Sequence, residues 1–295
     1  MIRSWRRPLL AAALSLTAGI AGLAVPAAAS AEPPSGPASG TFTVTGDPDD
    51  PVTRGGTFSL STATGMTAQL YGSPFDARVE AVDPATGANF YLVLAPDGGP
   101  LEPRTYTGAT AWPYYEGGPG MVLNSHLGGC DGDLAGSFTI QDIRFGPYNY
   151  LEKLDATFEQ HCSGGAPAAR GEVHLTNPPA PPPLNPQATV AGLGTVVMPD
   201  GVVTVRGTLT CSQAALVFVD PHIEQNGRLV GLDRAEVQCL AGQAVPWSAT
   251  RTEPSGVRLR PGDANVRLEI SGRDPFYDVY VRVDPPLFPV RLDAA

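Results

Sequence analysis

Apolar and polar residues alternate along most of the chain, which is the pattern of a β-strand with one buried face. In GVVTVRGTLTC (201–211), valine, leucine and cysteine occupy one face, while threonine and arginine occupy the other. Turn signals separate such segments: Pro-Asp-Gly at 199–201, Asn-Gly at 226–227 and Pro-Gly at 261–262. Short strands with regular turns are typical of β-sandwiches and barrels. The second half of the chain is therefore predicted to be all-β.

The first half shows the same alternation, with Gly, Pro or Asp in nearly every gap. The predicted strands are GTFTVTG, GTFSLST, MTAQLYG, ARVEAVD, NFYLVLA, AGSFTIQDIRF and GEVHLT. One segment, LEKLDATFEQHC (151–162), is ambiguous. Its leucines and Phe158 would line one face of a helix, whereas Leu154, Ala156 and Phe158 would line one face of a strand. The β-branched and aromatic residues in it, and the strand candidates on both sides, favour a strand.

A composition break divides the chain into two halves. The segment NPPAPPPLNP (177–186) is predicted to form an extended, semi-rigid spacer, at roughly 3.1 Å per residue. Two cysteines precede it, Cys130 and Cys162, and two follow it, Cys211 and Cys239. Four cysteines allow three pairings, and pairing within each half is the simplest. We therefore predict two β-sandwich domains, immunoglobulin-like or jelly-roll-like, joined by a Pro-rich linker.

The N-terminus has the three parts of a secretory signal. Arginines at positions 3, 6 and 7 precede an apolar run from Leu9 to about Val25, and the small residues 29–31 form a cleavage site. A retained anchor would need roughly 20 apolar residues, and Ser, Thr and Gly interrupt this run. The double arginine resembles a twin-arginine signal, but Trp5 and Pro8 fit poorly, which favours the general secretory route. We expect a secreted protein with no membrane insertion after signal removal.

These boundaries divide the chain into five predicted segments: a signal peptide (1–31), a flexible N-terminal segment (32–39), a first β-sandwich (40–176), the linker (177–186) and a second β-sandwich (187–295). Removing the signal and its three arginines changes the net charge from −10 to −13. Nucleic-acid binding needs clustered Lys and Arg, and Lys153 is the only lysine, so we expect no nucleic-acid partner. Such acidity favours solubility.

Three motifs resemble a known family. They are APDGGPLEPRTYTGA, GGCDGDLAGSFTIQDI and FEQHCSGGAPAARGEVHL, within roughly residues 90–177. They resemble a family of secreted bacterial β-domains, of actinobacterial type, which has no established activity. GGCDG departs from the family pattern, in which an Arg precedes the Cys and an Asn follows it. The resemblance implies a disulfide-stapled β-domain. The second half is similar to an immunoglobulin-like module of exported proteins, although Trp247 follows Cys239 instead of lying between the cysteines.

Cys162 adjoins His161 in FEQHCSGG, which has the residue types of a thiol nucleophile with its base, or of part of a metal site. In an oxidising compartment, however, two cysteines in a small β-domain normally pair. A catalytic thiol would need Cys130 to stay unpaired, and zinc would want four ligands, whereas the chain has no Cys-x-x-Cys. We predict disulfides Cys130–Cys162 and Cys211–Cys239. His161 would then point to the opposite strand face from Cys162.

Other candidates for metal or acid–base chemistry are scattered. His126 and His161 flank the first cysteine pair, so they could gather near Asp131 and Asp133. CDGDLAG offers alternate oxygen ligands but lacks the remaining features of a calcium loop, and the acidic loop TGDPDDP (45–51) is similar in this respect. Solvated turns are the simpler interpretation of both loops. The chain has no Gly-x-Ser-x-Gly motif. We expect no cofactor.

The most suggestive surface is TAWPYYEGGPG (110–120), where Trp112, Tyr114 and Tyr115 lie among Gly and Pro. Aromatic side chains on loops bind sugars and peptides and concentrate at hot spots, although they also plug the ends of sandwiches. Because no complete catalytic site is visible, we expect a secreted, non-catalytic binding or structural protein, with a cell-envelope glycan or protein as candidate partner. The alternative is a secreted hydrolase that cleaves polysaccharide with Glu80 and Glu116.

Overall fold

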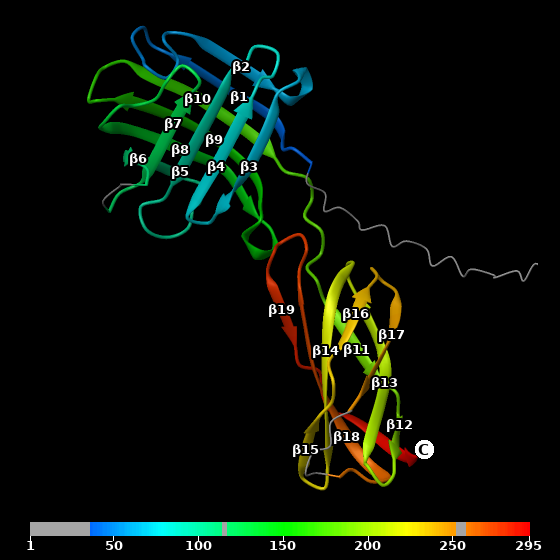
Figure 1. The fold of residues 1–295 in the computed structure, drawn as a ribbon. Coiled ribbons are helices and arrows are strands. Elements are labelled where there is room, and N and C mark those ends of the chain that lie inside the picture. The colour runs from blue at the N-terminus through cyan, green and yellow to red at the C-terminus, as the bar shows by residue number, and fades with distance from the viewer. Residues whose placement is uncertain (1–35, 114–116, 252–257) are drawn as a thin grey trace, which may run out of the picture. The chain divides into compact units, whose positions relative to one another are not determined.

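The computed structural model describes residues 36–113, 117–251 and 258–295, and these form an all-β protein (Figure 1). The strands belong to two ten-stranded sheets, called here the first and the second sheet. The predicted signal peptide (1–31) lies outside the described residues. Among the residues described, no helix is long and apolar enough to cross a membrane.

The first sheet has the strand order β2-β1-β10-β9-β8-β6-β7-β5-β4-β3. Its strands are β1 (Ser39–Gly46), β2 (Thr57–Ser61), β3 (Thr67–Ser73), β4 (Asp76–Val82), β5 (Asn89–Ala95), β6 (Thr105–Ala111), β7 (Gly120–Ser125), β8 (Leu134–Phe145), β9 (Leu151–Cys162) and β10 (Ala168–Thr176). Two 3₁₀ turns accompany them, η1 (Thr62–Thr64) and η2 (Pro147–Asn149). The ambiguous segment 151–162 is strand β9, so the strand prediction is confirmed.

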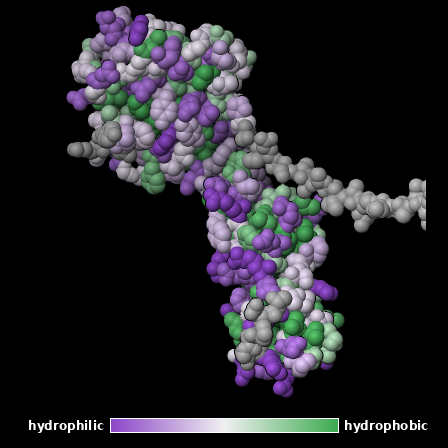
Figure 2. All heavy atoms as spheres, viewed as in Figure 1, coloured by the Kyte–Doolittle hydropathy of each residue, from purple (hydrophilic) through white to green (hydrophobic). Residues whose placement is uncertain are grey.

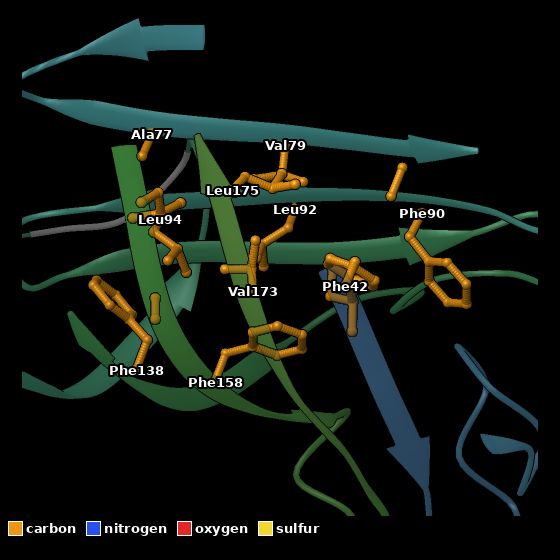
Figure 3. Packing of buried hydrophobic residues seen from close by; sticks show 14 of the residues in the cluster. Phe42, Ala77, Val79, Phe90, Leu92, Leu94, Phe138, Phe158, Val173 and Leu175 are labelled. Atoms are coloured by element: carbon orange, nitrogen blue, oxygen red, sulfur yellow. The ribbon is translucent and has the colours of Figure 1, made fainter. Parts of the chain in front are cut away.

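One hydrophobic core serves both halves of the first sheet, because inward residues alternate with outward ones along each strand. Phe42 on β1 stacks on Phe90 of β5 with ring centroids 5.4 Å apart, although five other strands lie between β1 and β5 in the sheet order (Figure 3). The Asn177 side chain joins the halves at one edge, donating to Leu70 O of β3 at 2.7 Å and Leu151 O of β9 at 2.6 Å. The sheet therefore curves around its own core.

The second sheet has its own core. Its strands are β11 (Pro186–Val190), β12 (Leu193–Val197), β13 (Val202–Cys211), β14 (Ala215–Gln225), β15 (Arg228–Gly231), β16 (Ala235–Cys239), β17 (Ala244–Thr250), β18 (Gly262–Arg273), β19 (Tyr280–Val283) and β20 (Phe288–Ala294). Leu184, from the predicted linker, is buried in this core. The Leu184 N–H donates to the buried Asp274 carboxylate at 2.7 Å, as does the Gln213 side chain. The second core thus begins two residues before β11.

The structure joins the cysteines in the two predicted pairs, Cys130–Cys162 and Cys211–Cys239, with Cα atoms 5.0 and 6.0 Å apart. Each bond lies within one sheet's core region. The predicted Asn-Gly turn connects β14 to β15, and both of its residues have positive φ, as a type I′ hairpin turn requires.

Candidate functional site

A row of aligned side chains crosses the outward face of four strands of the first sheet. Gln69 on β3 pairs with Glu80 on β4, Glu80 with Tyr91 on β5, and Tyr91 with Asn124 on β7. The residues on either side of each of them in sequence are more buried than the row residue between them. We call these four residues the polar row. It presents two amides, a carboxylate and a phenol to one side of the sheet.

A second row runs parallel to the first, displaced from it by two residues on each strand. It contains Arg78 on β4, Val93 on β5 and Val122 on β7, in register with one another. Trp112 directly follows β6, and its backbone N–H donates to Met121 O of β7 at 3.0 Å. The Arg78 guanidinium carbon lies 4.9 Å from the centroid of the Trp112 ring. Because β7 and β5 lie between β6 and β4, these two side chains must reach toward each other across both strands.

Burial of Val93 shows what this stacked pair covers. Val93 has no exposed surface, yet it is absent from the hydrophobic core that contains its neighbours Leu92 and Leu94. Alternation along β5 places it on the outward face, beneath the span between Arg78 and Trp112. Trp112 is half-buried and also lies outside that core. We call the stacked side chains of Arg78 and Trp112 the ridge, and they lie beside the polar row.

Hydrogen bonds hold the charged groups of this face. The Arg78 Nε lies 2.5 Å from an oxygen of Asp76, and the Tyr71 hydroxyl donates to Glu80 Oε1 at 2.6 Å. Burial and the bond to Glu80 raise the pKa of Tyr71 well above its usual range, so the hydroxyl stays protonated and remains a donor. One guanidinium and two carboxylates give the face a formal charge of −1 at neutral pH.

Tyr114, Tyr115 and Glu116 lie outside the described residues, so of the predicted aromatic loop only Trp112 is placed. The separation of the predicted hydrolase pair is likewise not described, since it includes Glu116. The other member, Glu80, has one oxygen engaged by Tyr71. The structure adds the surroundings of Trp112, which are the Arg78 guanidinium, two valines and the polar row.

The two candidate histidines have different surroundings. The His126 ring packs edge-on against Phe58 and Phe90, with centroids 6.2 and 6.4 Å apart. His161 lies on the outward face of β9, where its Nε2 is 2.7 Å from Glu159 Oε1. The Glu159 carboxylate also accepts from Arg170 on β10, at 3.1 Å. Aromatic packing positions His126, and a hydrogen bond to Glu159 positions His161.

The acidic candidates are also placed. Asp131 and Asp133 are exposed in the turn after Cys130, and no group of three or more His, Cys, Asp or Glu is arranged to hold a metal ion within the described part of the chain. In the loop 45–51, Asp47 accepts from Arg170 at 3.0 Å, and the buried Asp50 accepts from the backbone and side chain of Thr53. The carboxylates of Asp47 and Asp50 therefore make hydrogen bonds within the protein.

Sequence analysis missed one important residue, Gln160. Gln160 is fully buried on β9, and its side chain accepts from Leu123 N at 2.7 Å and donates to Leu123 O at 2.9 Å. β7 pairs with β6 only at Gly120 and Met121, so further along that edge Gln160 takes the place of a strand partner for Leu123. A lone polar residue at an inward position was the available clue.

Comparison of the sequence with protein-family models finds no match, and comparison with characterised proteins finds none either. The resemblance to secreted bacterial β-domains therefore stays a prediction.

Proposed function

We propose that the protein is a secreted, non-catalytic binding protein that holds its ligand on the outward face of β3, β4, β5 and β7. The observation that carries this proposal is the ridge: Arg78 and Trp112 stack outside the core and cover Val93. Tryptophan and arginine concentrate at binding hot spots because they combine apolar area with polar contacts. The ridge adjoins the polar row, so apolar and hydrogen-bonding surfaces meet on one face.

Location outside the cytoplasm is part of the proposal. Two disulfides are typical of extracellular proteins, since reducing compartments keep thiols free. The N-terminal signal pattern, with cleavage after Ala31, supports the same location. We also infer that each sheet with its core and disulfide is a separate β-sandwich domain, and that the prolines of 177–186 form the linker between them. The candidate partners are a glycan or a protein of the bacterial cell envelope.

The test is binding to isolated cell-envelope fractions, with Trp112→Ala as the decisive variant. Sedimentation with purified cell-wall polysaccharide and capture of extracted surface proteins should both be measured. Tyr280→Ala is the control, because Tyr280 is a 69% exposed aromatic residue on the second sheet. We expect Trp112→Ala to lose binding and Tyr280→Ala to retain it. Equal binding by both variants and the native protein would overturn the proposal, and polysaccharide cleavage lost in Glu80→Gln would favour the hydrolase alternative.

A further inference from the structure

We propose that the ligand is a linear glycan of neutral sugars that lies across the strands, along the polar row and beside the ridge. This inference rests on the proposed function and specifies the ligand's chemistry and direction. It depends on three properties of the face: the spacing of the row, the open hydrogen-bonding groups on it, and its charge.

The row sets the direction. Gln69, Glu80, Tyr91 and Asn124 occupy four adjacent strands in register, so they follow one line perpendicular to the strands. Neighbouring strands lie about 4.8 Å apart, which gives the line a length of roughly 14 Å. The spacing between neighbouring strands is close to the length of one pyranose unit in an extended chain. A linear oligosaccharide laid across the strands would therefore meet one side chain of the row per sugar.

The row also has groups free for hydroxyls. The side chains of Gln69 and Asn124, at its two ends, are exposed and make no hydrogen bond to other described residues. At the centre, Tyr91 is half-buried, so part of its phenol ring is open to a ligand. Glu80 has one oxygen engaged by a tyrosine and the other open within the described structure. The amides can donate to and accept from sugar hydroxyls, the Glu80 carboxylate can accept from them, and an aromatic ring suits the C–H surfaces of a sugar.

Charge selects neutral sugars. Arg78 is the cation of this face, and Asp76 at 2.5 Å and the Trp112 ring already engage it. Glu80 then leaves the row with an uncompensated negative charge, on a chain whose predicted secreted form has a net charge of −13. A phosphate or uronate polymer would bring like charges together at this site, which weakens binding. Neutral hydroxyls meet no such repulsion.

The experiment is calorimetric titration of the secreted protein with defined hexasaccharides. The neutral probes are cellohexaose, laminarihexaose and mannohexaose, and hexagalacturonate is the anionic probe. We expect at least one neutral hexamer to bind more tightly than hexagalacturonate. Gln69→Ala and Asn124→Ala should each weaken that hexamer roughly 2- to 10-fold, the equivalent of one hydrogen bond. The matching disaccharide is too short to span the row, so at most one of these two variants should weaken its binding. Gln238→Ala, an exposed glutamine on β16, is the matched control.

The outcomes separate the two proposals. If Trp112→Ala abolishes hexamer binding while Gln69→Ala and Asn124→Ala leave it unchanged, the direction along the row is wrong and the site stands. Tighter binding of hexagalacturonate would overturn the neutral class. If no neutral hexamer binds, the glycan inference fails, and Trp112-dependent capture of a surface protein decides the fate of the proposed function separately.

Discussion

Replacement of Gln160 by methionine tests how the strand that carries part of the candidate site is held. Methionine keeps the length and nearly the volume of the side chain, so packing around β9 should change little. It removes both hydrogen bonds to Leu123, at 2.7 and 2.9 Å. Because Leu123 has no exposed surface, its N–H and C=O would then be buried without a partner.

The expected cost follows from those two groups. A buried donor or acceptor left without a partner costs about 1–3 kcal/mol, so the loss of both should lower the free energy of unfolding of the first sheet in Gln160→Met by about 2–6 kcal/mol. That is a large part of the 5–15 kcal/mol typical of a whole domain. The control is Thr157→Val, three residues from Gln160 on the outward face of the same strand, which should change it by less than about 0.5 kcal/mol.

Urea unfolding of both variants should be followed by hydrogen exchange with mass spectrometry, so that peptides of the first sheet are measured separately from the second. In Gln160→Met, peptides covering β7 should lose protection first, because Gln160 is the partner of that edge. Binding at the polar row should weaken too, since Asn124 lies on β7. A Gln160→Met protein as stable as Thr157→Val, with β7 protection unchanged, would refute the reasoning.

Three further predictions concern the staples and ion pairs. Replacing Cys130 and Cys162 together by alanine should destabilise the first sheet by about 3–4 kcal/mol, and the native protein should show no thiol to alkylating reagents, by intact mass, until it is reduced. A hydrogen bond from Arg170 lowers the pKa of Asp47, so this contact stabilises the fold at neutral pH and its contribution is lost as the pH falls below about 4. The urea midpoint of Arg170→Gln should therefore fall less on acidification than that of the native protein. Parallel pH curves for the two proteins would contradict this. Asp274→Ala should lower the stability of the second sheet by roughly 3–5 kcal/mol, because the buried carboxylate accepts hydrogen bonds from three backbone N–H groups and one side-chain amide. Unchanged thermal melting of Asp274→Ala would show that those donors find other acceptors.

The sequence by itself determined the strands and the cysteine pairs. Alternation is a local property, since each residue's burial in a strand follows from its parity, and segments such as 151–162 and 201–211 show it without reference to any partner. Cysteine pairing followed from compartment and from the even division around the prolines. Trp112 and Glu80 were candidates for the same reason: residue type in a local context is enough to select them.

Only the tertiary structure decided what those residues meet. Strand order and register depend on long-range pairing, such as β6 leaving β8 to run parallel to β7, and no local pattern specifies it. That pairing brings Trp112 over Val93 to Arg78, and aligns Gln69 with Asn124 from strands more than fifty residues apart. The buried pairing of Gln160 with β7 has the same origin, because a side chain can complete a strand edge only where folding has placed the two together.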